Sequence, residues 1–239
     1  MDTLVVGDIH NKLEPITNFL KNWKGKVIFT GDYFDDFGDD PYIAMRTAHW
    51  LKSNLDNPNY IFLMGNHDFH YMTLPYLFSC SGFNEHKHEY INKIIKKEDW
   101  NKLKFFHHEE EYWFSHAGIS SQWFSHPIID INVDIINKTI ESCLPFIRTG
   151  PFEKIAPLWA SDFLRGGVYK TGGILWNDWN NRQFFPNVTQ IMGHTPQKHI
   201  LVMEDEEINA KCINIDAYKT SNEILHICEN TLNILTLNG

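Results

Sequence analysis

The chain has 239 residues, 43% of them hydrophobic, so it can bury a sizeable core, and a single domain over residues 1–239 is the favoured organisation. It carries 21 Lys and Arg against 30 Asp and Glu, and this net charge of -9 argues against a broad nucleic-acid-binding or anionic-membrane surface. The four cysteines form no Cys-x-x-Cys pair, and neither a signal peptide nor a bilayer-spanning run is expected. A cytoplasmic protein with reduced thiols is therefore expected.

The first predicted strand, over residues 3–6, ends in two side chains that can bind a metal. The strand is followed by Gly7-Asp8-Ile9-His10. Side chains two positions apart in an extended segment project to the same side, so Asp8 and His10 can reach one ion together. Apolar residues then recur at helical spacing over 15–23, which predicts an amphipathic helix that covers the sheet.

The next two strands end in the same kinds of residue. Val27-Ile28-Phe29 leads into Gly31-Asp32, and the apolar run 60–64 leads into Gly65-Asn66-His67-Asp68. Taken alone, Asn-His-Asp is also ordinary turn chemistry. The recurrence of Gly-Asp or Gly-Asn at three strand ends favours a metal site, because oxygen and imidazole ligands there can converge on one point.

A helix is predicted between these two strands. Asp39 or Asp40 can cap it, Pro41 lies in its first turn, and residues 44–51 carry its buried face. The order strand, helix, strand, helix, strand implies parallel pairing. In parallel sheets, ligands bind beyond the carboxyl ends of the strands, which is where these metal-binding residue types fall.

The middle of the chain is less regular. Residues 71–103 are predicted to be mainly helical. The run His107-His108-Glu109-Glu110-Glu111 joins two aromatic segments, and a hairpin turn accounts for it better than a metal site does. The second aromatic segment leads into Ser115-His116-Ala117-Gly118, another ligand type at a strand end. Residues 120–173 have one isolated helical pattern and two glycine pairs, which favours a cap or substrate-facing insertion.

The last part of the chain is predicted to be rich in strands. Residues 190–192 end in Gly193-His194-Thr195-Pro196. Short strands are expected to follow at 200–203, 211–215, 224–228 and 232–237. A strand-rich half after a βαβ half predicts two mixed sheets packed face to face with helices outside. The expected fold class is α/β (α+β), a four-layer αββα sandwich.

The strand ends together supply two carboxylates, one amide oxygen and three imidazoles. These six candidate metal ligands are Asp8, His10, Asp32, Asn66, His116 and His194. They make a complete set for two ions if one carboxylate bridges them. Mixed nitrogen and oxygen ligands favour divalent transition metals, with Mn expected first and Fe, Zn, Co or Ni as alternatives, over Ca or Mg.

The ordered series GDIH, GDYFD, GNHD, SHAG and GHTP resembles the calcineurin-like metallophosphoesterase superfamily, over nearly the whole chain from Gly7 to Pro196. Within it, the sequence resembles the branch of PPP-type Ser/Thr protein phosphatases and symmetrical diadenosine tetraphosphatases. The segments 65–70 and 116–123 are closer to the tetraphosphatases. The segments 175–178 and 214–216 are similar to stretches common in the phosphatases.

The resemblance implies a role for each matching residue. Asp8, His10 and Asp32 would hold the first ion. Asp32 would bridge to the second ion, which Asn66, His116 and His194 would complete. A hydroxide activated by both cations would attack phosphorus in line. The general acid for the leaving oxygen would be His67, held and made more basic by Asp35.

Three positions depart from the family pattern. Asn11 replaces a glycine that shapes the first turn, and Thr195 stands where many members carry a second histidine. Asp36 stands where the phosphatases have the arginine that grips the substrate phosphate. Other arginines must then bind phosphate, because a guanidinium suits phosphate oxygens. Among Arg148, Arg165 and Arg182, the latter two are the predicted substrate-binding residues.

Two substrate classes remain open, and the missing arginine separates them. A dinucleoside polyphosphate or related nucleotide can bind through its bases, for which Trp123, Trp159, Trp176 and Trp179 offer stacking surface. A phosphorylated Ser/Thr side chain, the alternative, depends more on the phosphate clamp. A third hypothesis, an interaction scaffold without activity, conflicts with the intact ligand set. The expected partner is a phosphorylated small molecule or phosphoprotein, and no membrane.

Overall fold

The computed structural model describes residues 2–36, 38–73, 78–124, 126–229 and 231–238. The chain divides into two compact units. The first comprises Met1–Lys104, Gln197–Ile200 and Ile215–Gly239, and the second comprises Phe105–Pro196 and Leu201–Asn214. Each unit contains one five-stranded mixed sheet with helices, which confirms the predicted α/β class of two mixed sheets flanked by helices.

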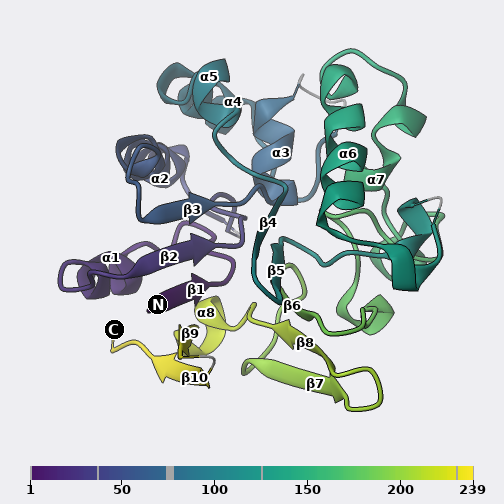
Figure 1. Cartoon of the computed structure of the whole chain (residues 1–239). Helices are drawn as coiled ribbons and strands as arrows, with labels where there is room; N and C mark the ends of the chain where they lie inside the picture. Colours follow the sequence, from purple (N-terminus) through teal and green to yellow (C-terminus); the bar gives the residue numbers. More distant parts are fainter. Residues whose placement is uncertain (1, 37, 74–77, 125, 230, 239) are drawn as a thin grey trace. The chain divides into compact units, whose positions relative to one another are not determined.

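The sheet of the first unit has the strand order β10-β9-β1-β2-β3. Its strands are β1 (Thr3–Val6), β2 (Lys26–Phe29), β3 (Tyr60–Phe62), β9 (Glu223–Cys228) and β10 (Thr231–Thr236). The three N-terminal strands run parallel, as predicted, and lie side by side in Figure 1. The antiparallel strands β9 and β10 extend this sheet on the side of β1. The three parallel strands therefore end at one edge of the sheet.

The helices of the first unit follow from local sequence signals. They are α1 (Glu14–Leu20), α2 (Pro41–Asn54), α3 (Asn66–Met72), α4 (Glu85–Ile94), α5 (Lys97–Trp100) and α8 (Tyr218–Ser221). The cap of α2 is Asp40, whose side chain accepts a hydrogen bond from the backbone N–H of Tyr42. Its predicted buried face, from Ala44 to Leu51, is confirmed. The first helix is shorter than predicted and ends at Leu20, and Trp23 instead stacks on Phe19.

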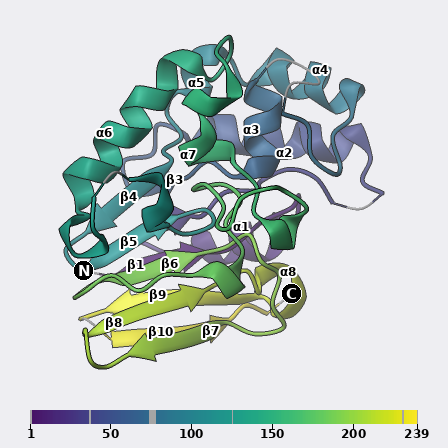
Figure 2. The same ribbon diagram turned by 90° about the vertical axis from the view of Figure 1, so that its right-hand side faces the viewer.

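The sheet of the second unit has the strand order β4-β5-β6-β8-β7. Its strands are β4 (Phe106–Glu109), β5 (Tyr112–Ser115), β6 (Thr189–Met192), β7 (Leu201–Asp205) and β8 (Ala210–Asn214), of which β7 and β8 lie along the lower edge of Figure 2. The predicted hairpin around residue 110 is confirmed by the antiparallel pairing of β4 and β5. Within that hairpin, His107 Nε2 contacts Glu109 Oε1 at 2.9 Å.

Within the described residues of the segment 120–173 lie the α-helices α6 (Val133–Cys143) and α7 (Ala156–Trp159). Short 3₁₀ turns connect them and recur just beyond this segment. These turns are η1 (Ser121–Trp123), η2 (Ile128–Asp130), η3 (Leu144–Phe146), η4 (Phe152–Lys154), η5 (Phe163–Arg165) and η6 (Trp179–Asn181). Such single turns leave little periodicity to detect in a sequence. In the described ranges, no helix combines the length and apolar character that crossing a membrane requires.

The turns after β2 and β3 approach each other closely at two glycines. Gly31 has a φ of 108°, a conformation that other residues rarely adopt. A Cβ atom on Gly65 would overlap the backbone N of Asp32 and lie 2.9 Å from its Cγ atom. Only glycine at position 65 leaves room for the side chain of Asp32.

We predict that Gly65→Ala destabilises the protein by about 1–3 kcal/mol, because the added methyl group overpacks this contact. It should also weaken binding of Mn²⁺, since Asp32 must move. Thermal unfolding and metal titration measure the two effects. Gly38→Ala is the matched control, because a Cβ there meets no atom within 4 Å and only its φ of 74° opposes the change. Equal metal affinity in both variants would contradict the steric role of Gly65.

Candidate active site

Three side chains converge at the carboxyl ends of β1 and β2 in the first unit. Asp8 and Asp32 are buried, His10 is half-buried, and one ligand atom from each lies within 4.8 Å of the others. His10 Nε2 lies 3.9 Å from Asp32 Oδ2. One imidazole and two carboxylates at this spacing can hold a divalent cation.

The ring of His10 is oriented for metal binding. Its Nδ1 donates to the backbone carbonyls of Phe34, at 3.0 Å, and Asp35, at 2.6 Å, so that Nε2 is left to face Asp32. Such a second contact is usual for metal-binding histidines. Burial lowers the pKa of His10 and favours the neutral ring, whose lone pair can bind a metal.

The loops that carry these residues are held in a strained conformation. His10 and Asp32 have φ values of 44° and 50°, in the left-handed region that non-glycine residues rarely adopt. The buried carboxylate of Asp68 accepts hydrogen bonds from the backbone N–H groups of Asp32 at 2.7 Å, Tyr33 at 2.9 Å and Gly65 at 2.9 Å. Asp68 therefore ties the loop after β2 to the start of α3, a role that the sequence did not reveal.

The carboxylate of Asp35 is the centre of a buried polar cluster. Its Oδ1 accepts hydrogen bonds from Tyr71 Oη at 2.6 Å and Lys87 Nζ at 2.9 Å. Its Oδ2 lies 3.1 Å from His67 Nδ1 and 2.9 Å from His70 Nε2. Burial opposes the charged carboxylate, but His67 and His70 outweigh it, and the pKa of Asp35 lies well below its usual range. Asp35 is thus a permanent negative charge.

His67 lies in the first turn of α3 and has a carboxylate partner on its ring and another on its backbone. Its N–H donates to Asp32 Oδ1 at 2.9 Å, and its Nδ1 faces Asp35. Burial opposes the imidazolium form, but Asp32 and the hydrogen bond to Asp35 outweigh this effect. The pKa of His67 therefore lies well above its usual range. These surroundings favour the protonated ring, which is the form that a general acid needs.

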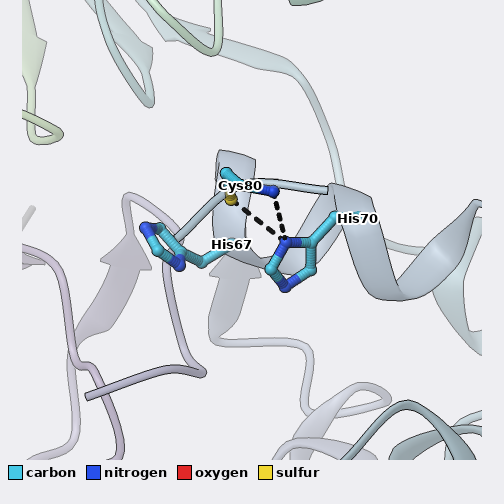
Figure 3. Close-up of side chains that lie close together, drawn as sticks. All are labelled: His67, His70 and Cys80. Atoms are coloured by element: carbon cyan, nitrogen blue, oxygen red, sulfur yellow. Dashed lines mark hydrogen bonds between the residues drawn. The ribbon is translucent and has the colours of Figure 1, made fainter. Parts of the chain in front are cut away.

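His70, Cys80 and Lys87 also belong to this cluster, although the sequence analysis does not predict them. His70 Nδ1 lies 3.0 Å from Cys80 Sγ and accepts from the Cys80 backbone N–H at 3.3 Å (Figure 3). Lys87 is buried and contacts both Asp35 and Asp39. The sequence offers a signal for His70 alone, because it follows His67 by three residues on one helix face. For Cys80 and Lys87 no local pattern exists.

The second unit brings together the two remaining predicted histidines. His116 follows β5, His194 follows β6, and both are buried. His116 Nε2 lies 3.1 Å from His194 Nδ1. Two imidazole nitrogens at this distance can bind one cation, so the donor chemistry fits a divalent metal. The half-buried ring of Trp176 packs edge-on against His194, with centroids 5.4 Å apart.

Asn66 is the remaining predicted ligand. It is buried at the start of α3, and its Nδ2 donates to Cys80 Sγ at 3.6 Å. Because the amide nitrogen is used in this way, the amide oxygen is the atom suited to a metal.

The two predicted substrate arginines have different surroundings. Arg165 lies beside His194, where its Nη2 donates to Thr195 Oγ1 at 2.6 Å and its Nε pairs with Asp178 at 2.8 Å. Arg182 donates to the carbonyl of Trp179 at 3.1 Å and lies over the ring of that residue. Arg165 is therefore the better placed of the two to meet a phosphate near His194.

The acidic residue Asp36, at the position where the resemblance places the arginine of the phosphatases, is paired with a cation. Asp36 Oδ1 is in direct contact with the ammonium group of Lys219, from α8. The expected repulsion between Asp36 and a substrate phosphate is thus offset by a positive charge in the same place.

The chain matches the calcineurin-like phosphoesterases over residues 1–212. It belongs to this family. The motifs GDIH, GDYFD, GNHD, SHAG and GHTP all fall in the matched range. As a member of the family, the protein is a metal-dependent phosphohydrolase.

Three solved structures give further comparisons. The chain is similar to the cold-active protein-tyrosine phosphatase of a psychrophilic Shewanella species, with a TM-score of 0.63 and 18% identity, covering 99% of this chain and 80% of the other. It is also similar to a metallophosphoesterase from Sphaerobacter thermophilus, with a TM-score of 0.48, 13% identity and coverage of 100% and 90%. The third is a protein provisionally assigned as a diadenosine tetraphosphatase, with a TM-score of 0.47 and 12% identity, covering 100% of this chain and 95% of the other. The first likeness shows the fold alone, and the other two are too weak to support an argument. No curated protein matches the chain.

We predict that kcat has an alkaline limb set by the raised pKa of His67, because activity is lost when the acid loses its proton. Asp35→Asn removes the negative charge that raises this pKa, so the limb should move to lower pH. His67→Asn should abolish the limb and lower kcat roughly 10²- to 10⁴-fold. These profiles are measured with an alkyl phosphate, whose leaving group needs a proton.

Tyr71→Phe is the control for these profiles. It removes a hydrogen bond to Asp35 without changing its charge, so the limb should stay near its wild-type position. An unmoved limb in Asp35→Asn would rule out the pairing of His67 and Asp35 as the source of the acid.

Proposed function

We propose that the protein hydrolyses a phosphoanhydride bond of a dinucleoside polyphosphate or a related nucleotide at a dinuclear metal centre. The observation that carries the reaction type is the paired acid His67–Asp35, whose loop neighbours include the cation-binding set Asp8, His10 and Asp32. A positioned proton donor and a cation site are the two components that phosphoester hydrolysis needs.

The proposed centre follows the family motif. Asp8, His10 and Asp32 would hold the first ion, and Asp32, Asn66, His116 and His194 the second, with manganese as the favoured metal. Bound cations would stabilise negative charge on the phosphoryl group and activate water. In this scheme His67 holds a proton and delivers it to the leaving oxygen. Asp35 keeps that proton in place, and Asp68 fixes the loop that carries Asp32.

The preference for a nucleotide is supported by the surroundings of His194. Trp176 is half-buried and packs against that histidine, so an adenine base could stack on it while the phosphates reach the ions. Trp159 and Trp179 are buried and belong to the core, and Trp123 packs on Tyr169. Among the predicted stacking residues, Trp176 is the one beside a proposed ligand. Arg165 would supply the phosphate contact, with Arg182 as the alternative.

A Ser/Thr protein phosphatase is the second candidate function. One observation favours it. Lys219 pairs with Asp36, so the repulsion between Asp36 and a dianionic phosphate is reduced. A monodentate ammonium is still a weaker phosphate clamp than the bidentate arginine of those phosphatases. We also propose a cytoplasmic location, which four free cysteine thiols support.

Chelation is expected to abolish activity and Mn²⁺ to restore it, because the proposed site has no covalent catalytic group. Asp32→Asn should lose both metal and activity, since neutralising the bridge weakens both ion sites. Metal analysis and turnover are measured on the same preparations. Asp130→Asn makes the same chemical change at an exposed position and should behave as wild type. Two tightly held ions with normal turnover in Asp32→Asn would exclude the bridging role.

Diadenosine tetraphosphate should be hydrolysed with higher kcat/KM than a phosphoserine or phosphothreonine peptide under one Mn²⁺ condition. Trp176→Ala should raise KM for the dinucleotide by about 5-fold or more, the scale of one lost base–aromatic stack. It should change KM for the peptide little. Trp23→Ala, which removes another half-buried tryptophan, is the control. If the peptide is turned over faster, and nucleotides are neither cleaved nor inhibit its hydrolysis, the protein is a Ser/Thr protein phosphatase instead.

A further inference from the structure

We propose that His67, His70 and Cys80 form a third metal site, separate from the dinuclear centre, which takes Zn²⁺ and inhibits the enzyme. The binding part of this proposal stands on the geometry of the cluster. The inhibitory part rests on the proposed function, because it depends on His67 acting as the general acid.

The three side chains are already close enough to share an ion. One ligand atom from each lies within 4.8 Å of the others, and His70 Nδ1 is 3.0 Å from Cys80 Sγ. Zinc binds nitrogen at about 2.0 Å and thiolate sulfur at about 2.3 Å, so two nitrogens and one sulfur around a tetrahedral ion lie roughly 3.3–3.5 Å apart. Small side-chain rotations bring the cluster to that spacing. Figure 3 shows the two rings on either side of the thiol.

Asp35 orients both imidazoles in the way that metal-binding histidines require. Its Oδ2 contacts His67 Nδ1 at 3.1 Å and His70 Nε2 at 2.9 Å. Each ring therefore uses one nitrogen on the carboxylate and can offer the other as a ligand. These are Nε2 in His67 and Nδ1 in His70, which already faces Cys80 and accepts its backbone N–H. A carboxylate behind a ligating histidine fixes the ring and makes it a better donor. Here one carboxylate serves two histidines at once.

The donor set distinguishes this site from the dinuclear centre. A thiolate with two imidazoles selects zinc, whereas Mn²⁺ prefers oxygen donors such as those of Asp8 and Asp32. Three protein ligands leave a fourth position for water, as in open zinc sites. An enzyme loaded with Mn²⁺ at the centre could therefore still bind zinc at the cluster.

Zinc binding at the cluster would remove the proton that catalysis needs. The thiol of Cys80 releases its proton as the Zn–S bond forms, and His67 Nε2 gives its lone pair to the ion in place of a proton. Both protons go to solvent, and no electrons are transferred. With zinc on Nε2, His67 has no proton to deliver to a leaving oxygen. Inhibition then follows from the loss of this proton.

Cobalt substitution tests the site without reference to activity. When Co²⁺ is added to the Mn²⁺-loaded protein, a thiolate ligand produces charge-transfer absorption in the near ultraviolet, and the ligands of the dinuclear centre include no thiol. We expect this absorption in wild type and its loss in both Cys80→Ser and His70→Gln. Thermal unfolding of the variants verifies that they are folded. Absorption that persists in a folded Cys80→Ser protein, or its absence from wild type, would overturn the site.

Cys228→Ser is the matched control for the cobalt experiment. Cys228 also lies with a histidine and a carboxylate, His226 and Asp2, with ligand atoms within 4.8 Å. That group lies partly in solvent, and the carboxylate that contacts His226 is the exposed Asp2, in contrast to the buried Asp35 of the cluster. The absorption should persist in Cys228→Ser. Its loss there would move the thiolate site to Cys228 and overturn the proposal.

Zinc inhibition tests the regulatory part. Turnover with saturating Mn²⁺ is compared with and without one equivalent of Zn²⁺, and the ratio is taken for each variant. Wild type should be inhibited roughly 10²-fold, the usual worth of a general acid, and Cys80→Ser far less. Equal inhibition of both proteins would overturn the regulatory role. A cobalt signal in a protein without phosphoesterase activity would support the zinc site and contradict the proposed function. Activity without the cobalt signal would support the proposed function and contradict the zinc site.

Discussion

The buried carboxylate of Asp35 is the interaction on which the candidate site depends. A charge removed from water is costly unless partners and hydrogen bonds compensate it, and Asp35 has four partners. Two are histidines whose pKa values its charge raises against the effect of burial, and one is the buried ammonium of Lys87. The chemistry of His67 is therefore a by-product of how a charge is stabilised in the interior. Replacing Asp35 would therefore change the pKa of His67 while leaving His67 itself in the sequence.

A second buried carboxylate, Asp68, acts on the backbone instead of on side chains. It accepts hydrogen bonds from three N–H groups in two separate loops. These bonds hold Asp32 in the left-handed conformation, which non-glycine residues rarely adopt. The two carboxylates, Asp35 and Asp68, therefore have different roles. Asp68 sets where a ligand atom lies, and Asp35 sets where a proton lies. Rigid support of this kind is what a site needs to keep its geometry during a reaction.

The residues at strand ends could be predicted from the sequence because they depend on local patterns. A short apolar run, a glycine and a polar pair mark a strand end whatever the rest of the chain does, and this applies to Asp8 and Asp32. The cap of α2 and the hairpin near residue 110 are equally local. Lys87 and Cys80 could not be found in this way, because their partners lie on other elements and no local sequence pattern links them to those partners. The 3₁₀ turns between 120 and 181 leave no periodicity to detect.

The C-terminal strands were predicted as strands, but no local pattern could show which sheet they join. In the structure β9 lies between β10 and β1, so the first strand of the chain is flanked on one side by nearly the last. During synthesis β1 leaves the ribosome early, yet its partner is made only after residue 223. Until then β1 has an unpaired edge, which is a template for pairing with other chains. Completion of the first sheet thus waits until residues 223–228 have been made, and loss of this segment would leave that edge permanently open.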